Sequence, residues 1–170
     1  DLMQRRPLGM VLLRGRLPAL FGHCVVGGKA RLTVTAAAKD LWQVGGEIAE
    51  RLANQANMDL ARREAMSEIR RWLPGLDFSG AEIAICRAIR AEARTTDRRR
   101  PSGVHVNRVA PRIVVAWPTK LALAPVLADE VFAQVTMEVK RPAGYAELPP
   151  WPTPPVARYP WEEAEWFPAP

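Results

Sequence analysis

The sequence predicts an α+β fold: a mostly antiparallel sheet with one packed helix, then a strand-turn-helix unit and an extended tail. Three observations support this prediction. Alternating or β-branched apolar runs recur in the first half, a helical period of threes and fours appears twice, and prolines crowd the end of the chain. The chain has 170 residues, of which 48% are hydrophobic, so it is long enough to bury a core of its own.

The first half of the chain predicts strands. Residues 8–14 are an apolar, strand-like run. Residues 31–35 alternate with a period of two, and residues 41–44 follow after a polar turn, which predicts an antiparallel hairpin. Gly45 and Gly46 close this hairpin. They do not indicate a phosphate-binding loop, because no third glycine or lysine follows at the required offset.

A helical period from residue 57 to residue 72 predicts the packed helix. Asn57 or Asp59 is placed to cap its start, and Pro74 with Gly75 would stop it. Isoleucines favour a further strand at residues 81–89. The apolar face of the predicted helix comprises Met58, Ala61, Ala65, Ile69 and Trp72.

The most informative stretch is the strand-turn-helix unit of residues 112–135. A short strand at residues 103–106 and a turn at residues 107–111 would lead into it. Residues 113–116 are continuously apolar and mostly β-branched, which suits a strand buried on both faces. From Lys120 onward the period becomes helical. The apolar positions of this second helix are Leu121, Ala124, Leu127, Ala128, Val131, Phe132 and Val135.

The turn between this strand and helix is a candidate binding site. The free N–H groups and positive dipole end of a helix start favour an anion or a polarised carbonyl. Thr119 is placed to cap the helix, Lys120 would add a full charge, and Pro125 falls in the first turn, where its missing N–H costs least. The alternative is a structural corner that binds nothing, with Lys120 in water.

A run of arginines between residues 87 and 100 allows three interpretations. It would be a nucleic-acid patch, a solvated loop paired with Glu92 and Asp97, or a strand from which one arginine binds a substrate carboxylate. No aromatic residues interleave with the arginines, so we do not expect nucleic acid to be the partner. His23, between glycine and cysteine, is a hydrogen-bonded structural residue or a member of a substrate pocket.

Several stretches, in order, resemble the FAD-dependent oxidoreductases of the D-amino-acid oxidase and glycine/sarcosine oxidase superfamily. Residues 115–125, Val-Ala-Trp-Pro-Thr-Lys-Leu-Ala-Leu-Ala-Pro, are similar to the C-terminal β-turn-α of that family. The stretch at 5–12, the hairpin ending in Gly-Gly, the Leu-Pro-Gly-Leu turn at 73–76 and the segment at 87–97 are similar to successive parts of its substrate domain. The family turn is glycine-rich, whereas this chain has Trp117, Pro118 and Lys120.

This resemblance implies FAD as cofactor and hydride transfer from an amine or amino acid to the flavin, giving an imine. It implies that the flavin is contacted by Trp117, Pro118, Thr119, Lys120 and Leu121, with Lys120 also acting in catalysis, and that the substrate is contacted by Arg87, Arg90 and His23. The glycine-rich G-x-G-x-x-G turn that grips FAD is missing from this sequence. We therefore expect the C-terminal part of an enzyme, inactive alone, with apolar surface exposed where the dinucleotide-binding half belongs.

The expected organisation is a substrate-domain-like region at 1–111, the returning strand-turn-helix at 112–136 and a Pro/Trp-rich tail at 137–170. The tail is expected to pack its tryptophans on a surface. No run of apolar residues is long enough for a membrane span, and no signal peptide is apparent. The two isolated cysteines favour buried thiols in a reducing compartment, with a structural disulfide as the alternative, so we expect the cytoplasm. The net charge of +6 leaves a basic binding module, or a partner-binding tail, as alternative functions.

Overall fold

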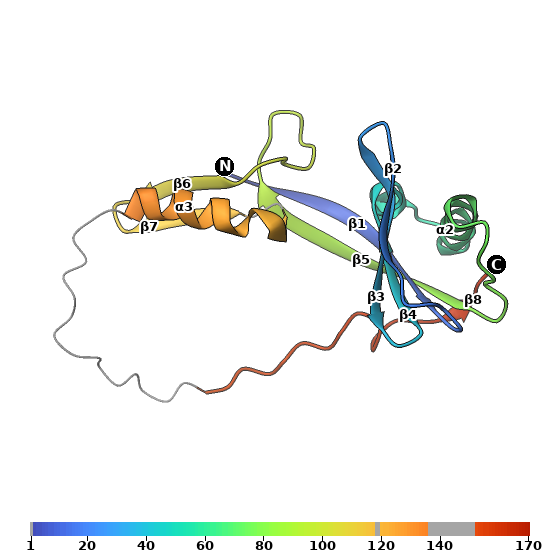
Figure 1. Ribbon diagram of the computed structural model, residues 1–170. Helices are drawn as coiled ribbons and strands as arrows, with labels where there is room; N and C mark the ends of the chain where they lie inside the picture. Colours follow the sequence, from blue (N-terminus) through green and yellow to red (C-terminus); the bar gives the residue numbers. More distant parts are fainter. Residues whose placement is uncertain (1, 118–119, 136–151) are drawn as a thin grey trace. The chain divides into compact units, whose positions relative to one another are not determined.

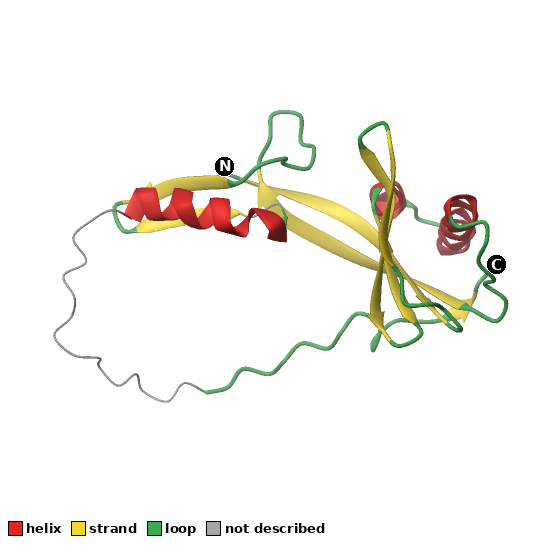
Figure 2. Ribbon diagram, in the orientation of Figure 1, coloured by secondary structure: helices red, strands yellow, loops and turns green. Residues whose placement is uncertain are grey.

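The computed structural model describes residues 2–117, 120–135 and 152–170. Within these residues the fold is α+β, with mostly antiparallel strands and few helices, as the sequence predicts (Figure 1, Figure 2). The chain forms two compact units. One comprises Arg6–Arg90 with Ala157–Pro170, and the other comprises Asp1–Arg5 with Ala91–Val156.

The predicted hairpin, the strands at 8–14 and 81–89 and both helices are confirmed, and both of those strands extend beyond their apolar runs. The strands are β1 (Met3–Arg14), β2 (Phe21–Val26), β3 (Lys29–Ala38), β4 (Leu41–Gly45), β5 (Glu82–Ala93), β6 (His105–Ala110), β7 (Ile113–Trp117) and β8 (Phe167–Pro168). The helical segments are α1 (Glu47–Arg51), the 3₁₀ turn η1 (Leu52–Asn54), α2 (Met58–Trp72), the 3₁₀ turn η2 (Leu121–Leu123) and α3 (Ala124–Val135).

One sheet has the strand order β2-β3-β4-β1-β5-β8. Its register places Val34 opposite Val44, and Val44 opposite Val11. Directly opposed residues share one face of a sheet, and these valines belong to the core on which α2 packs. The α2 residues buried there are Ala61, Ala65, Met66 and Ile69.

The core is closed by a buried tryptophan. Trp42 is 1% exposed, its Nε1 donates to the Pro18 carbonyl at 2.7 Å, and its ring meets Phe78 edge-on with centroids 6.2 Å apart. Each such large apolar side chain contributes about 1.5–3 kcal/mol to the stability of the fold by leaving water.

The predicted cap of α2 is also present, because Asn57 Oδ1 accepts from the Leu60 N–H at 3.0 Å. The helical period and cap predicted from the sequence of α2 therefore agree with its packing on the core.

The sequence does not predict the α1–η1 segment, because Gly45 and Gly46 indicate only the end of the hairpin. Gly46 has φ 94°, and a Cβ there would lie 2.8 Å from the Ala30 carbonyl oxygen, so only glycine makes this turn without strain. Leu52 then packs against β1 at Gly9, where a Cβ would lie 2.9 Å from Leu52 Cβ. Glycine at both positions lets the helical segment lie close against the sheet.

The second unit contains the β6–β7 hairpin and α3. β6 runs to Ala110, so the turn predicted at residues 107–111 is wrong, and the strand predicted at residues 103–106 lies further along the chain. Asn107, Arg108 and Ala110 pair with β7 residues, and the hairpin turn lies at Pro111 and Arg112. β7 was expected to be buried on both faces, but Ile113 is 55% exposed and the rest of the strand is half-buried.

Cys24 and Cys86 are free thiols and half-buried, not the buried thiols expected. The tail begins outside the described residues and returns to end in β8, which pairs with β5. A proline-rich segment is compatible with strand structure at the edge of a sheet.

Candidate functional site

The predicted cofactor turn begins where β7 ends. Trp117 is the last residue of β7 and is half-buried, whereas Pro118 and Thr119 lie outside the described residues. Lys120 is exposed and extended, with φ −144° and ψ 142°, and its carbonyl accepts from the Leu123 N–H at 2.9 Å. Leu121 is 91% exposed. The chain thus places a cation at the start of a helical segment, an arrangement that favours an anionic or polarised oxygen.

The helix that follows carries apolar residues on two sides. One side of α3 packs on β6 and β7. The half-buried residues of η2 and α3 are the apolar Leu123, Leu127 and Val131 and the polar Gln134. No residue of α3 is fully buried, and Phe132 is 74% exposed, with Val126 and Val135 also exposed. Large apolar side chains left exposed in this way are candidates for an interaction surface.

A single arginine fixes the end of α3 to the hairpin. The Arg108 guanidinium donates to the Pro111 carbonyl at 2.7 Å and to the Gln134 carbonyl in the last turn of α3. Gln134 Nε2 in turn lies 3.5 Å from the Val106 carbonyl. Arginine is well suited to this place because it satisfies the unpaired carbonyls at a helix C-terminus.

His23 lies on the face of the sheet opposite α2. In the strand register His23 pairs with Thr33, and Thr33 pairs with Gly45. None of these three residues belongs to the core. A Cβ on Gly45 would lie 3.0 Å from Met10 Cε and 3.1 Å from Thr33 Oγ1, so Met10 and Thr33 pack closely on either side of the glycine. The His23 side chain is exposed and has no hydrogen bond among those the structure describes. The hydrogen-bonded structural interpretation is therefore not supported.

Arg87 and Arg90 project from opposite faces of β5. Arg87 is an even number of positions along β5 from the core residue Ile83, so the two side chains project from the same face. The Arg87 guanidinium donates to the Gln55 carbonyl and lies 3.5 Å from Met58 Sδ. It therefore lies on the helix side. Because strand side chains alternate, Arg90 projects from the other face of β5. Three strands separate β5 from β2, which carries His23. The sequence left these two arginines as equal candidates, and the structure separates them.

In the remainder of the arginine run, Arg99 is held by a local interaction with Asp97. Arg99 Nε lies 3.8 Å from Asp97 Oδ2, and the Arg99 N–H donates to Asp97, which holds the pKa of that carboxyl below its usual range. Glu92 is buried and accepts from Gln4 Nε2 at 3.0 Å. Asp97 pairs with one arginine of the run, and strand alternation places Arg87 and Arg90 on different faces, which favours the structural interpretation over a nucleic-acid surface.

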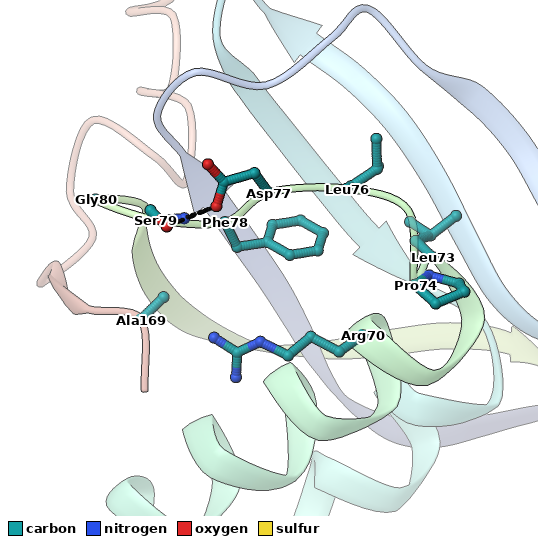
Figure 3. Close-up of a pocket in the computed structure, with 9 residues that line it drawn as sticks. All are labelled: Arg70, Leu73, Pro74, Leu76, Asp77, Phe78, Ser79, Gly80 and Ala169. Carbon is teal, nitrogen blue, oxygen red and sulfur yellow. Dashed lines mark hydrogen bonds between the residues drawn. The ribbon is translucent and has the colours of Figure 1, made fainter.

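A shallow cavity of about 430 Å³ lies in the unit formed by Arg6–Arg90 and Ala157–Pro170, and no predicted site residue lines it. Figure 3 shows Arg70 extending across it toward Ala169, opposite the Asp77–Ser79 turn. The Ser79 hydroxyl and N–H donate to Asp77 Oδ1 at 2.6 and 2.8 Å, which holds the pKa of Asp77 below its usual range. This carboxylate stabilises a turn and is not suited to act as a base near neutral pH.

Met10, Thr33 and Gln43 were not singled out from the sequence, although they lie on the same face as His23. The signal was present in the alternation of β3, where Thr33 lies between the core residues Leu32 and Val34. Among the described helices, none is both long and apolar enough to cross a membrane.

No protein-family model matches the chain. The chain is 39% identical over 168 residues to a probable FAD-dependent oxidoreductase from Pseudomonas aeruginosa, covering 95% of this chain and 43% of that protein. The crystal structure of the FAD-dependent oxidoreductase of the same name from that organism aligns with a TM-score of 0.75 over 94% of this chain and 46% of the crystallised chain. Nearly all of this chain is therefore similar to less than half of that oxidoreductase.

Proposed function

We propose that this chain is the C-terminal part of an FAD-dependent oxidoreductase. The observation that carries the proposal is the 39% identity and the TM-score of 0.75 to an FAD-dependent oxidoreductase over 94% of the chain. Identity at that level along the whole segment supports a shared cofactor as well as a shared fold.

The proposal requires a second half. The sequence has no G-x-G-x-x-G turn to hold the FAD pyrophosphate, and it matches only 43% of the relative's length. The exposed apolar residues of α3 and β7, Phe132 and Ile113 among them, have the character of a surface that packs against another sheet. In our proposal the β7–α3 unit completes the dinucleotide-binding domain, and the sheet that carries His23 belongs to the substrate domain.

The residues at the β7–α3 turn fit the polar edge of a flavin. Lys120 is exposed at a helix start, and a cation with free N–H groups stabilises negative charge on a neighbouring carbonyl oxygen. In the proposal Trp117 and Leu121 also contact the flavin, as would Pro118 and Thr119, which lie outside the described residues. Bound FAD would supply the redox chemistry by accepting a hydride from the substrate carbon.

The proposed substrate is an amine or amino acid, as in the D-amino-acid oxidase superfamily. By strand alternation Arg90 projects from the face of β5 away from α2, and His23 lies on the edge strand β2, separated from β5 by three strands of the same sheet. An arginine binds a carboxylate through two parallel hydrogen bonds, so Arg90 would bind and orient an amino-acid carboxylate. Arg87, on the helix face, would instead fix the Gln55 backbone.

The test is Lys120→Ala in the protein that contains the dinucleotide-binding half, with flavin reduction and reoxidation measured separately. Loss of a preorganised charge at the flavin should slow at least one half-reaction by about ten- to hundredfold. Lys39→Ala, at an exposed lysine in the β3–β4 turn, is the matched control and should leave both rates unchanged. Equal rates for Lys120→Ala and wild type in both half-reactions would remove Lys120 from the site.

A further inference from the structure

The last residues of the chain bind along the edge of β5. Phe167 lies opposite Ile83 and Pro168 opposite Glu82 in an antiparallel pair, and the Ala169 N–H donates to the Ala81 carbonyl at 2.9 Å. This segment makes β8 the outer strand of the sheet. Its geometry is that of a peptide added to a sheet edge.

The spacing of the prolines matches the pairing. In an antiparallel pair, alternate residues point their N–H groups toward the partner strand and away from it. Because Ala169 donates to β5, the nitrogens of Pro168 and Pro170 point away from β5, where no donor is needed. The outer edge of this segment therefore presents no N–H at these two positions to a further strand.

Two arginines hold the aromatic side chains of the segment. The Arg14 guanidinium lies 4.4 Å from the centroid of the Trp166 ring and pairs with Glu82 at 2.6 Å. The Arg62 guanidinium on α2 lies 3.8 Å from the centroid of the Phe167 ring, and the Arg62 side chain is only 12% exposed. Cation–π contacts strengthen when the cation is partly desolvated.

The segment ends against the cavity of Figure 3. Ala169 packs on the core cluster and lines the cavity, and Arg70 Nη1 donates to the Pro170 carbonyl. Backbone pairing, two aromatic contacts and a carbonyl contact therefore act on consecutive residues of one short segment.

We propose that the β5 edge, the Arg62 side of α2 and the loop at residues 73–80 form a peptide-binding site. Its ligand class is an extended Trp-Phe-Pro-Ala-Pro peptide, and its resident ligand is this chain's own segment at residues 166–170. The site recognises two features of the peptide. Its aromatic rings stack on Arg14 and Arg62, and its N–H at position 169, between two prolines, donates to β5.

The register is tested on the full chain by hydrogen exchange at the Phe167 amide. Ala169→Pro removes the donor to Ala81 and should speed exchange about fivefold or more. Pro168→Ala is the matched control, because it adds an N–H on the side away from β5, and should leave exchange within about twofold of wild type. Equal acceleration by both variants, or exchange in the wild type at the rate of an unstructured chain, would overturn the proposal.

Recognition is tested with a fluorescent peptide of residues 160–170 added to the full-chain Ala169→Pro variant, whose own segment is released. The peptide should bind this variant more tightly than it binds wild type, and a peptide carrying Ala169→Pro should not bind. Arg62→Ala in the receptor should weaken binding about two- to fivefold. Arg16→Ala, at an exposed arginine outside these contacts, should not change it. Failure of the wild-type peptide to bind, or equal binding of both peptides, would refute the site.

Discussion

We expect Arg87 and Arg90 to differ in role because they are three positions apart on a strand. An odd spacing places two side chains on opposite faces, and the contact of Arg87 with Gln55 and Met58 identifies its face as the helix side. The sequence alone offered both residues as substrate ligands, since neither the extent of β5 nor its core-facing positions were established.

Arg90→Ala in the complete enzyme should raise KM for a carboxylate substrate and lower kcat/KM by about ten- to hundredfold, the cost of a lost charged hydrogen-bond pair. Arg87→Ala removes the same charge from the other face and serves as the control. It should lower the free energy of unfolding, because the Gln55 carbonyl loses its donor, while KM stays unchanged. A KM effect from Arg87→Ala alone would reverse the assignment.

At the scale of elements, local pattern sufficed where it agreed with packing. The period of α2, its Asn57 cap and the β3–β4 hairpin followed from side-chain periodicity and turn residues. The sequence does not predict α1, because the segment depends on a positive φ at Gly46 and on the close approach of Leu52 to Gly9. Both are set by tertiary structure and not by a local sequence pattern. The end of β6 was misplaced because pairing with β7 overrides the turn preference of Asn107.

Gly9→Ala tests the close approach of η1 to β1. Its Cβ would lie 2.9–3.0 Å from Leu52 side-chain and backbone atoms, so the segment must shift, at a cost of about 1–3 kcal/mol in the free energy of unfolding. Gly22→Ala is the matched control on β2, because nothing lies within 4 Å of its Cβ position. Chemical denaturation should distinguish the two. A Gly9→Ala protein as stable as Gly22→Ala would show that the approach is not tight.

At the scale of the molecule, the sequence predicts the fold class, which the structure has. It also predicts an apolar surface exposed where the dinucleotide-binding half belongs, and this stays a prediction. Composition and periodicity report burial within a chain, but they do not report what covers a surface from outside it. Phe132 was predicted on the apolar side of its helix, and it is 74% exposed. Under the proposed function, the part of the enzyme that this chain does not include would cover Phe132.

The candidate site was predictable only in part. Lys120 followed from the change of period after β7, whereas Thr33 and Met10 became candidates only through the sheet register. A site assembled from several strands depends on pairings between residues distant in sequence, and one chain's periodicity does not specify these pairings.

The most direct test of the central claim is the absorbance spectrum of this chain joined to its dinucleotide-binding half. We predict a bound-flavin spectrum that bleaches when amines or amino acids are added without oxygen. A folded, colourless protein that takes up no added FAD would contradict the claim. A flavin spectrum that no amine or amino acid bleaches would retain FAD and reject the substrate class.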